Sequence, residues 1–285
     1  MENASKALLI AAGMFFAILI VSLLVVLYNN ISSYYIQKHE TTIIEQTQKF
    51  NAKFENYHRN NIRGSDLISL MNRIIDYNAT ESYFDGNNYE RIKVKITLGN
   101  NSILNQFKYK TDYETSKNKF LLENITNVNA TGDNWQNDKK LIAITNTSSE
   151  MCKLAQNNGI NNITDTKLQQ LASKISNIFV DEEDNSQMTI YNRLYRVEML
   201  EKLLGKDIIK VNEDTGKIKN TDTVSKNKLA IIKEIASQYY QYMQFKRAYF
   251  DCTEVKYDIE TNRVVEMNFK LQTKILNGVQ TVVFD

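Results

Sequence analysis

Few residues in this sequence could perform nucleophilic or acid–base chemistry. The two histidines, His39 and His58, lie near the N-terminus, whereas the two cysteines are Cys152 and Cys252. A histidine-activated cysteine needs its thiol within hydrogen-bond distance of the imidazole. We interpret both histidines as solvent-facing polar residues of one helix. We predict no catalytic residue and do not expect an enzyme.

The two cysteines allow two further interpretations, and the sequence does not decide between them. In an exported domain, Cys152 and Cys252 could form a disulfide, which stabilises by closing a long loop. They could equally be two unrelated buried thiols. Because there is no other cysteine and no CxxC motif, a structural zinc site is not expected.

A run of four acidic residues, Asp181–Asp184, could bind calcium through its carboxylates. An EF-hand loop that started at Asp181 would need Gly at its sixth position and Glu at its twelfth. The sequence has Ser186 and Asn192 there. We interpret the run as a solvated loop that precedes a helix, and we predict no metal or cofactor site.

Aromatic and basic residues provide the remaining candidates for binding. Arg59 and Arg63 could contact phosphate groups of a lipid or a cell-wall polymer. Six aromatic residues near one predicted helix could line a carbohydrate site, although such spacing is more typical of packing in a core. They are Tyr239, Tyr240, Tyr242, Phe245, Tyr249 and Phe250.

Charge and motif content argue against several classes of protein. The net charge is +2 and the sequence has no block of basic residues, so nucleic acid is not an expected partner. HExxH, GxSxG, a P-loop and a GxGxxG after a strand are all absent from the sequence, so the common hydrolase and nucleotide-binding signatures are missing.

The most informative element is a charge-free apolar run from Ala7 to Tyr28. About 22 helical residues extend for roughly 33 Å, enough to cross the hydrocarbon core of a bilayer. The run is longer than the apolar region of a signal peptide, and no small-x-small cleavage motif follows it. We therefore predict an uncleaved signal-anchor, a single-pass transmembrane helix over residues 1–28, with the lipid bilayer as a partner.

Basic residues near the anchor predict its orientation. Lys6 precedes the apolar run, and no Lys or Arg follows it until Lys38. Because basic residues concentrate on the cytoplasmic side, this distribution favours a cytoplasmic N-terminus and an extracellular C-terminal domain. The expected location is the cell membrane.

Beyond Tyr28 the helical pattern continues. No Gly or Pro occurs between Gly13 and Gly64, so we predict one helix from about Lys6 to Asn60, ended by Gly64. Residues 29–63 would form an amphipathic helical spine. Its apolar residues follow steps of three, four or seven: Ile36, Ile43, Thr47, Phe50, Phe54 and Tyr57.

The rest of the chain predicts an α+β fold, in which a helical insertion interrupts a strand-rich C-terminal module. Residues 64–145 would contain a helix from Ser65, a loop at 78–88, a half-buried strand at 91–98 and weaker strands at 107–109 and 141–145. Residues 146–250 form the insertion, with helices at 164–179, 188–205 and 227–250 and a hairpin at 208–219. Residues 251–285 would form antiparallel strands at 252–259, 263–273 and 279–284.

The opening MENASKALLIAAG and the segment FNAKFENYHRNNIRGSDLISLMNRIIDYN resemble uncharacterised single-span membrane proteins of low-GC Gram-positive bacteria. In that group an ENASKAL-type N-terminus precedes an F-N-x-x-F-x-x-Y helix, a Gly and a short helix that leads to strands. The resemblance covers about the first 80 residues. The matching positions are Phe50, Asn51, Phe54, Tyr57, Gly64, Leu67 and Leu70.

The layout is also similar to that of type IV pilins and pseudopilins, in which a half-buried helical spine carries a strand-rich head. The sequence departs from the pilin pattern at the processing site. No Gly followed by a hydrophobic residue precedes the apolar run, and Glu2 lies before the run instead of inside it.

These observations predict a non-enzymatic, membrane-anchored and exported structural or interaction protein, such as a pilin-like or surface-complex subunit. It would associate with protein partners or with itself through the N-terminal helix. The alternative is an extracellular ligand-binding or sensing module. That module would need a membrane partner to signal, because so few residues precede the anchor.

Overall fold

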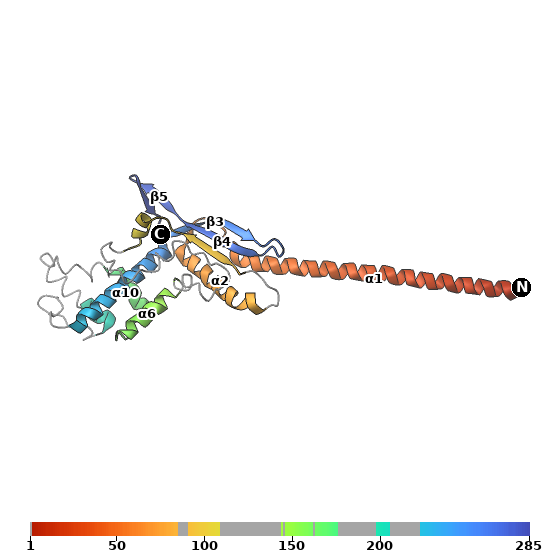
Figure 1. Ribbon diagram of the computed structural model, residues 1–285, viewed down its shortest axis with the longest axis horizontal. Coiled ribbons are helices and arrows are strands. Elements are labelled where there is room, and N and C mark those ends of the chain that lie inside the picture. The colour runs from red at the N-terminus through yellow and green to blue at the C-terminus, as the bar shows by residue number, and fades with distance from the viewer. Residues whose placement is uncertain are drawn as a thin grey trace. The chain divides into compact units, whose positions relative to one another are not determined.

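The computed structural model describes residues 2–84, 91–108, 144, 146–161, 163–175, 198–205 and 223–285. A long N-terminal helix is followed by a helical region and a strand-rich C-terminal sheet, so the predicted α+β fold class is confirmed (Figure 1). The chain divides into two compact units: Met1–Glu55 with Thr261–Arg263, and Asn56–Glu260 with Val264–Asp285.

The first unit is dominated by helix α1, Glu2–Glu55, which is 54 residues long and drawn as one continuous helix in Figure 1. At 1.5 Å per residue this is roughly 80 Å. The predicted end near Asn60 was wrong, because the helix ends at Glu55 and turns follow it. Asn61 has a φ of 58°, which a helix does not accommodate.

The C-terminal part of α1 contacts residues Thr261–Arg263 of the same unit. Asn51 Nδ2 donates to the Asn262 carbonyl oxygen at 2.9 Å, and the Arg263 guanidinium lies over the Phe50 ring at 5.0 Å from its centroid. These contacts pair a side-chain amide with a backbone carbonyl and a cation with an aromatic face. They hold the C-terminal end of α1 against residues Thr261–Arg263.

The second unit contains a four-stranded sheet in the order β1-β3-β4-β2. Strands β1 (Ile62–Arg63), β3 (Tyr249–Tyr257) and β4 (Val264–Leu271) are antiparallel neighbours, whereas β2 (Lys93–Thr97) runs parallel to β4. Alternation along the strands places Val94, Ile96, Met267 and Phe269 in the buried core. The half-buried strand predicted at 91–98 is confirmed.

Helix α2 (Gly64–Phe84) packs against α10 (Thr223–Arg247) at a point of close backbone approach. A Cβ at Gly64 would lie 1.8 Å from the Phe245 carbonyl oxygen, so only glycine fits there. Gly64 is therefore the first residue of α2. The prediction that it ends the first helix was wrong.

The loop predicted to begin at residue 78 was wrong, because α2 continues to Phe84. Asn78 is buried within that helix. Its amide donates to the Ile92 carbonyl at 3.0 Å, and its side-chain oxygen accepts from the Ile92 N–H at 2.9 Å. The amide thereby acts as a strand partner for the backbone just before β2.

The helical region forms its own hydrophobic core. Helices α6 (Thr147–Asn157), α7 (Asp165–Ser173) and α10, with helical residues 198–204, supply its side chains. Ile232, Ala236 and Tyr239 of α10 lie in it, as their helical spacing predicted. The predicted hairpin at 208–219 and most of the candidate strand at 141–145 lie outside the described residues.

One strand prediction was wrong and another was confirmed. Residues 101–105 form the short helix α3 (Asn101–Asn105), and the chain continues in a turn to residue 108, where a strand was expected at 107–109; residue 109 lies outside the described residues. The strand predicted at 263–273 is confirmed as β4, which ends at Leu271. A separate hairpin then begins, made of β5 (Thr273–Leu276) and β6 (Val279–Val282), which pair with each other.

Candidate functional site

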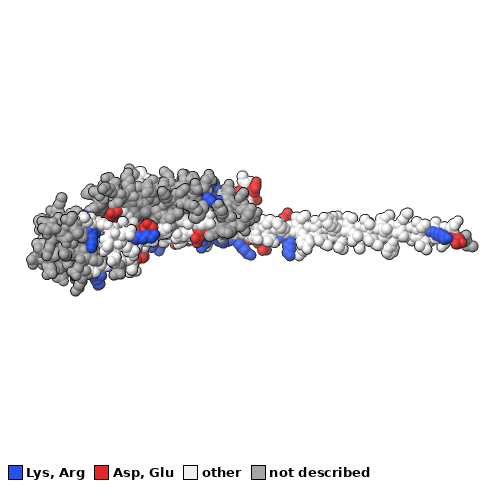
Figure 2. Space-filling model, turned by 60° about the horizontal axis from the view of Figure 1, so that its bottom comes forward, with Lys and Arg blue, Asp and Glu red and all other residues white. Residues whose placement is uncertain are grey.

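The exposed apolar surface of α1 is the main candidate for a functional site. Every residue from Glu2 to Ile31 is exposed, and Leu8 and Leu9 are each 75% exposed. Beyond the charged side chains at its N-terminal end, Figure 2 shows this stretch as a surface without Lys, Arg, Asp or Glu. A protein in water does not leave so large an apolar surface uncovered. By length and composition, α1 is compatible with a single-pass membrane anchor.

Charged and aromatic residues mark the ends of this surface. Lys6 pairs with Glu2 at 3.3 Å, and the next charged residue along the chain is Lys38. The charge-free interval between them is about 46 Å long, close to the thickness of a bilayer with its headgroups. Tyr34 and Tyr35, both exposed, form an edge-to-face pair near its end. Tyrosines are enriched at membrane–water interfaces.

The amphipathic stripe predicted for the spine is buried along part of its length. Thr47, Phe50 and Phe54 are buried, as the spacing predicted, and so is Asn51, which the predicted stripe did not include. Towards the N-terminus, however, Ile36 and Ile43 are 56% and 47% exposed. The apolar stripe therefore continues in sequence to Ile36, but no described residue buries its N-terminal part.

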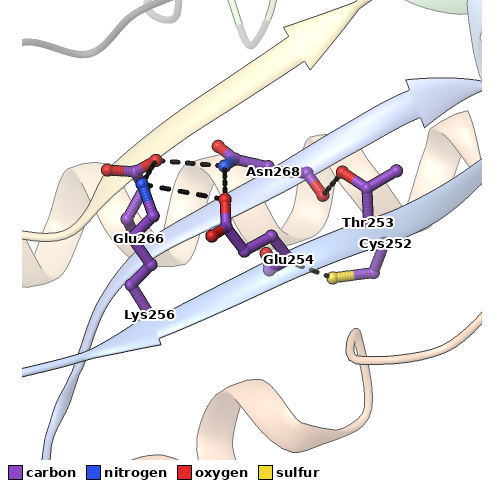
Figure 3. Close-up of polar contacts among 6 residues, drawn as sticks. All are labelled: Cys252, Thr253, Glu254, Lys256, Glu266 and Asn268. Atoms are coloured by element: carbon purple, nitrogen blue, oxygen red, sulfur yellow. Dashed lines mark hydrogen bonds and ion pairs between the residues drawn. The ribbon is translucent and has the colours of Figure 1, made fainter.

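A group of polar side chains lies on the face of the sheet formed by β3 and β4 (Figure 3). Lys256 Nζ lies 2.9 Å from a Glu266 carboxylate oxygen and 3.7 Å from one of Glu254. Asn268 donates to both carboxylates, at 2.7 Å to Glu254 and 3.0 Å to Glu266. Its own side-chain oxygen is buried without a partner in the described part of the chain.

Ion pairs and hydrogen bonds between β3 and β4 determine the electrostatics of this group. The hydrogen bond from Lys256 holds the pKa of Glu266 below its ordinary value, despite the opposing effect of burial. Glu266 is therefore not poised as a proton donor at neutral pH. The group stabilises the strand pairing and holds no activated nucleophile.

A second polar group lies where α6, α7 and α10 meet. The Ser148 hydroxyl and the Tyr239 hydroxyl both donate to one oxygen of Asp165, the latter at 2.6 Å. Burial alone would raise the pKa of Asp165, but these two hydrogen bonds and nearby Lys246 outweigh it and lower the pKa. Burial and the bond to Asp165 raise the pKa of Tyr239. Sequence reasoning missed this group, because its members are far apart in the chain.

The residues considered for catalysis are not brought together. His39 and His58 are exposed, as expected. Cys152 and Cys252 are both free thiols, and burial raises the pKa of each, which makes them less reactive. In the described ranges no hydrogen bond joins either histidine to a cysteine. The acidic run Asp181–Asp184 lies outside the described residues.

The aromatic and basic candidates take structural positions. Arg63 pairs with Asp285 at 2.8 Å, and Arg59 lies 3.7 Å from Asp66. Of the six aromatic residues, three are buried and three are half-buried, which supports the packing interpretation. The buried ones are Tyr239, Phe245 and Phe250, and the half-buried ones are Tyr240, Tyr242 and Tyr249.

Comparison with known proteins finds no matching family model, no matching curated protein and no matching solved structure. A function for this chain is therefore proposed from its sequence and structure.

Proposed function

We propose that this chain is a non-enzymatic, membrane-anchored structural subunit that is exported and associates with itself through α1. The observation that supports the proposal is the uninterrupted helix from Glu2 to Glu55, apolar and exposed at one end and partly buried at the other. A helix of this kind can cross a bilayer and continue into water without a hinge.

The exposed residues beyond the apolar run support a role in assembly. Ile36, Ile43 and Ile44 are 47–56% exposed on α1, beyond the residues needed to cross a membrane. In neighbouring copies anchored in one membrane, these isoleucines would lie at the same distance from the membrane surface. Packing between these helices would cover the isoleucines, in the manner of a pilin-like subunit.

The test is mechanical shearing of intact cells, followed by blotting of the sheared supernatant and of the membrane pellet. The pellet is dissolved in mild detergent and sedimented. A structural subunit will appear as large sheared particles or as an assembly in detergent. Sedimentation as a monomer, with nothing in the sheared fraction, would refute the proposal.

Substitution of Ile18 tests whether assembly depends on the apolar run of α1. Ile18→Arg places a charge in the middle of the apolar run, at a cost of about 3 kcal/mol in the membrane. We expect this variant to lose assembly, because the charge disturbs packing between helices. The matched variant Ile18→Leu should retain assembly, and normal assemblies of Ile18→Arg would contradict a role for α1.

A further inference from the structure

The β5–β6 hairpin has one closed edge and one open edge. Its two-residue turn at Asn277 and Gly278, both with positive φ, makes Leu276 and Val279 a hydrogen-bonded pair. Pairs then alternate along the hairpin, and the bond from Val283 N–H to the Gln272 carbonyl agrees with this alternation. The backbone groups of Gln280 and Val282 on β6, and of Thr273 and Ile275 on β5, therefore point outward.

The edge of β6 is closed by a single side chain. Gln106 Nε2 donates to the Gln280 carbonyl at 2.8 Å, and Gln106 Oε1 accepts from the Val282 N–H at 2.8 Å. The amide thus takes the place of a neighbouring strand. The edge of β5 has no equivalent, since no described residue bonds to the outward backbone groups of Ile275.

The hairpin is also apolar near its turn and projects from the sheet. Ile275 is 79% exposed, and Leu276 and Val279 are 55% and 56% exposed. Figure 1 shows the hairpin extending away from β3 and β4. Exposed, unpaired and apolar strand edges pair with other strands unless something blocks them.

We propose that β5 pairs with β5 of a second copy of this chain, antiparallel and with Ile275 opposite Ile275. In this register the outward backbone groups of the two isoleucines bond to each other, and Lys274 lies opposite Leu276 of the other copy. The alternative register, with Thr273 opposite Ile275, would place the two Lys274 side chains directly opposite each other, which is unfavourable. Charge therefore favours the register with Ile275 opposite Ile275 over this alternative.

The small size of this contact explains why a second membrane-anchored copy is the fitting partner. Two four-residue strands bury far less than the roughly 1,200–2,000 Å² of a stable interface between free proteins. Anchoring in one membrane raises the effective concentration of one copy near another, so a weak contact can form. In this respect the inference rests on the proposed function.

Cysteine cross-linking of the full-length chain in membranes tests the pairing. With Cys152 and Cys252 changed to Ser, Ile275→Cys is oxidised and the disulfide-linked dimer is measured. Directly opposite residues in a hydrogen-bonded pair have Cα atoms about 5.5 Å apart, within the range of a disulfide. We expect most of the Ile275→Cys chain to become dimer.

Two matched cysteines control for register and for chance collision. Lys274→Cys residues would be diagonal neighbours, about 7–8 Å apart and too distant for efficient linkage. Ile259→Cys replaces another exposed isoleucine, 99% exposed outside the hairpin. Both should give at least fivefold less dimer than Ile275→Cys. Preferential linkage through Lys274→Cys, or no excess for Ile275→Cys, would overturn the inference.

The unsubstituted chain is sedimented in parallel in mild detergent. If it forms assemblies but Ile275→Cys does not cross-link, the β5 pairing is wrong and the proposed function stands. If it sediments as a monomer, the proposed association through α1 fails, whatever the cross-linking shows.

Discussion

At the scale of single residues, the main contribution of Asp165 is to organise hydrogen bonds between helices. It accepts from Ser148 of α6 and from Tyr239 of α10, so one carboxylate joins three helices. Asp165 itself is exposed, whereas Tyr239 is 2% exposed. The phenol therefore depends on this carboxylate for its hydrogen bond, because little water reaches it.

Replacing Tyr239 with Phe should lower the free energy of unfolding by about 1 kcal/mol, since it removes a hydrogen bond to a charged but partly solvated acceptor. Thermal unfolding of the full chain in detergent measures the change. As a matched control, Tyr242→Phe changes another phenol of α10, which is half-buried. A Tyr239→Phe variant as stable as the parent would show that the bond contributes nothing.

Stability should also depend on pH through Asp165. Its hydrogen bonds lower its pKa in the folded state, so its contribution is complete above the ordinary value of 3.8 and is lost as the pH falls through the lowered folded pKa. Acid titration of unfolding should show this loss. Asp165→Asn should be less stable at neutral pH and lack this part of the acid dependence; an unchanged acid profile would argue against it.

At the scale of elements, the position of α2 against α10 depends on Gly64. Gly64→Ala would place a methyl group 1.8 Å from the Phe245 carbonyl oxygen, and backbone cannot move aside as a flexible side chain can. We expect the free energy of unfolding to fall by about 3 kcal/mol.

Limited proteolysis and thermal unfolding measure that loss. The control is Gly13→Ala, because a Cβ at Gly13 meets no atom within 4 Å and the same change in residue type occurs without a clash. Equal stability of the two variants would mean that α2 and α10 do not approach as closely as this structure has them.

At the scale of the whole molecule, the distribution of charge around α1 predicts its orientation in the membrane. With Lys6 in the cytoplasm and Lys38 outside, Ser5→Cys and Glu40→Cys should lie on opposite sides. The native cysteines are changed to Ser in both variants. An impermeant maleimide added to intact cells should label Glu40→Cys and spare Ser5→Cys until the cells are lysed. Labelling of Ser5→Cys but not of Glu40→Cys in intact cells would indicate the opposite orientation.

Local patterns were enough to predict the long apolar N-terminal helix, the strand at β2 and the core face of α10. An apolar run of sufficient length has few alternatives to a membrane helix, and the alternation at Val94 and Ile96 places them on one face whatever surrounds them. The end of α1 was misplaced, because Gly64 read alone suggests a helix end. Its actual role depends on Phe245, which is distant in sequence.

The sequence by itself therefore determined that this protein has a long apolar N-terminal helix, compatible with a single-pass membrane anchor, and an α+β fold. The tertiary structure alone decided that β2 runs parallel to β4, that Gln106 closes the edge of β6, and that Ser148, Asp165 and Tyr239 meet. The physical reason is range. Helical periodicity and strand alternation act between residues a few positions apart, whereas these contacts join backbone and side chains that only the packed chain brings within hydrogen-bond distance.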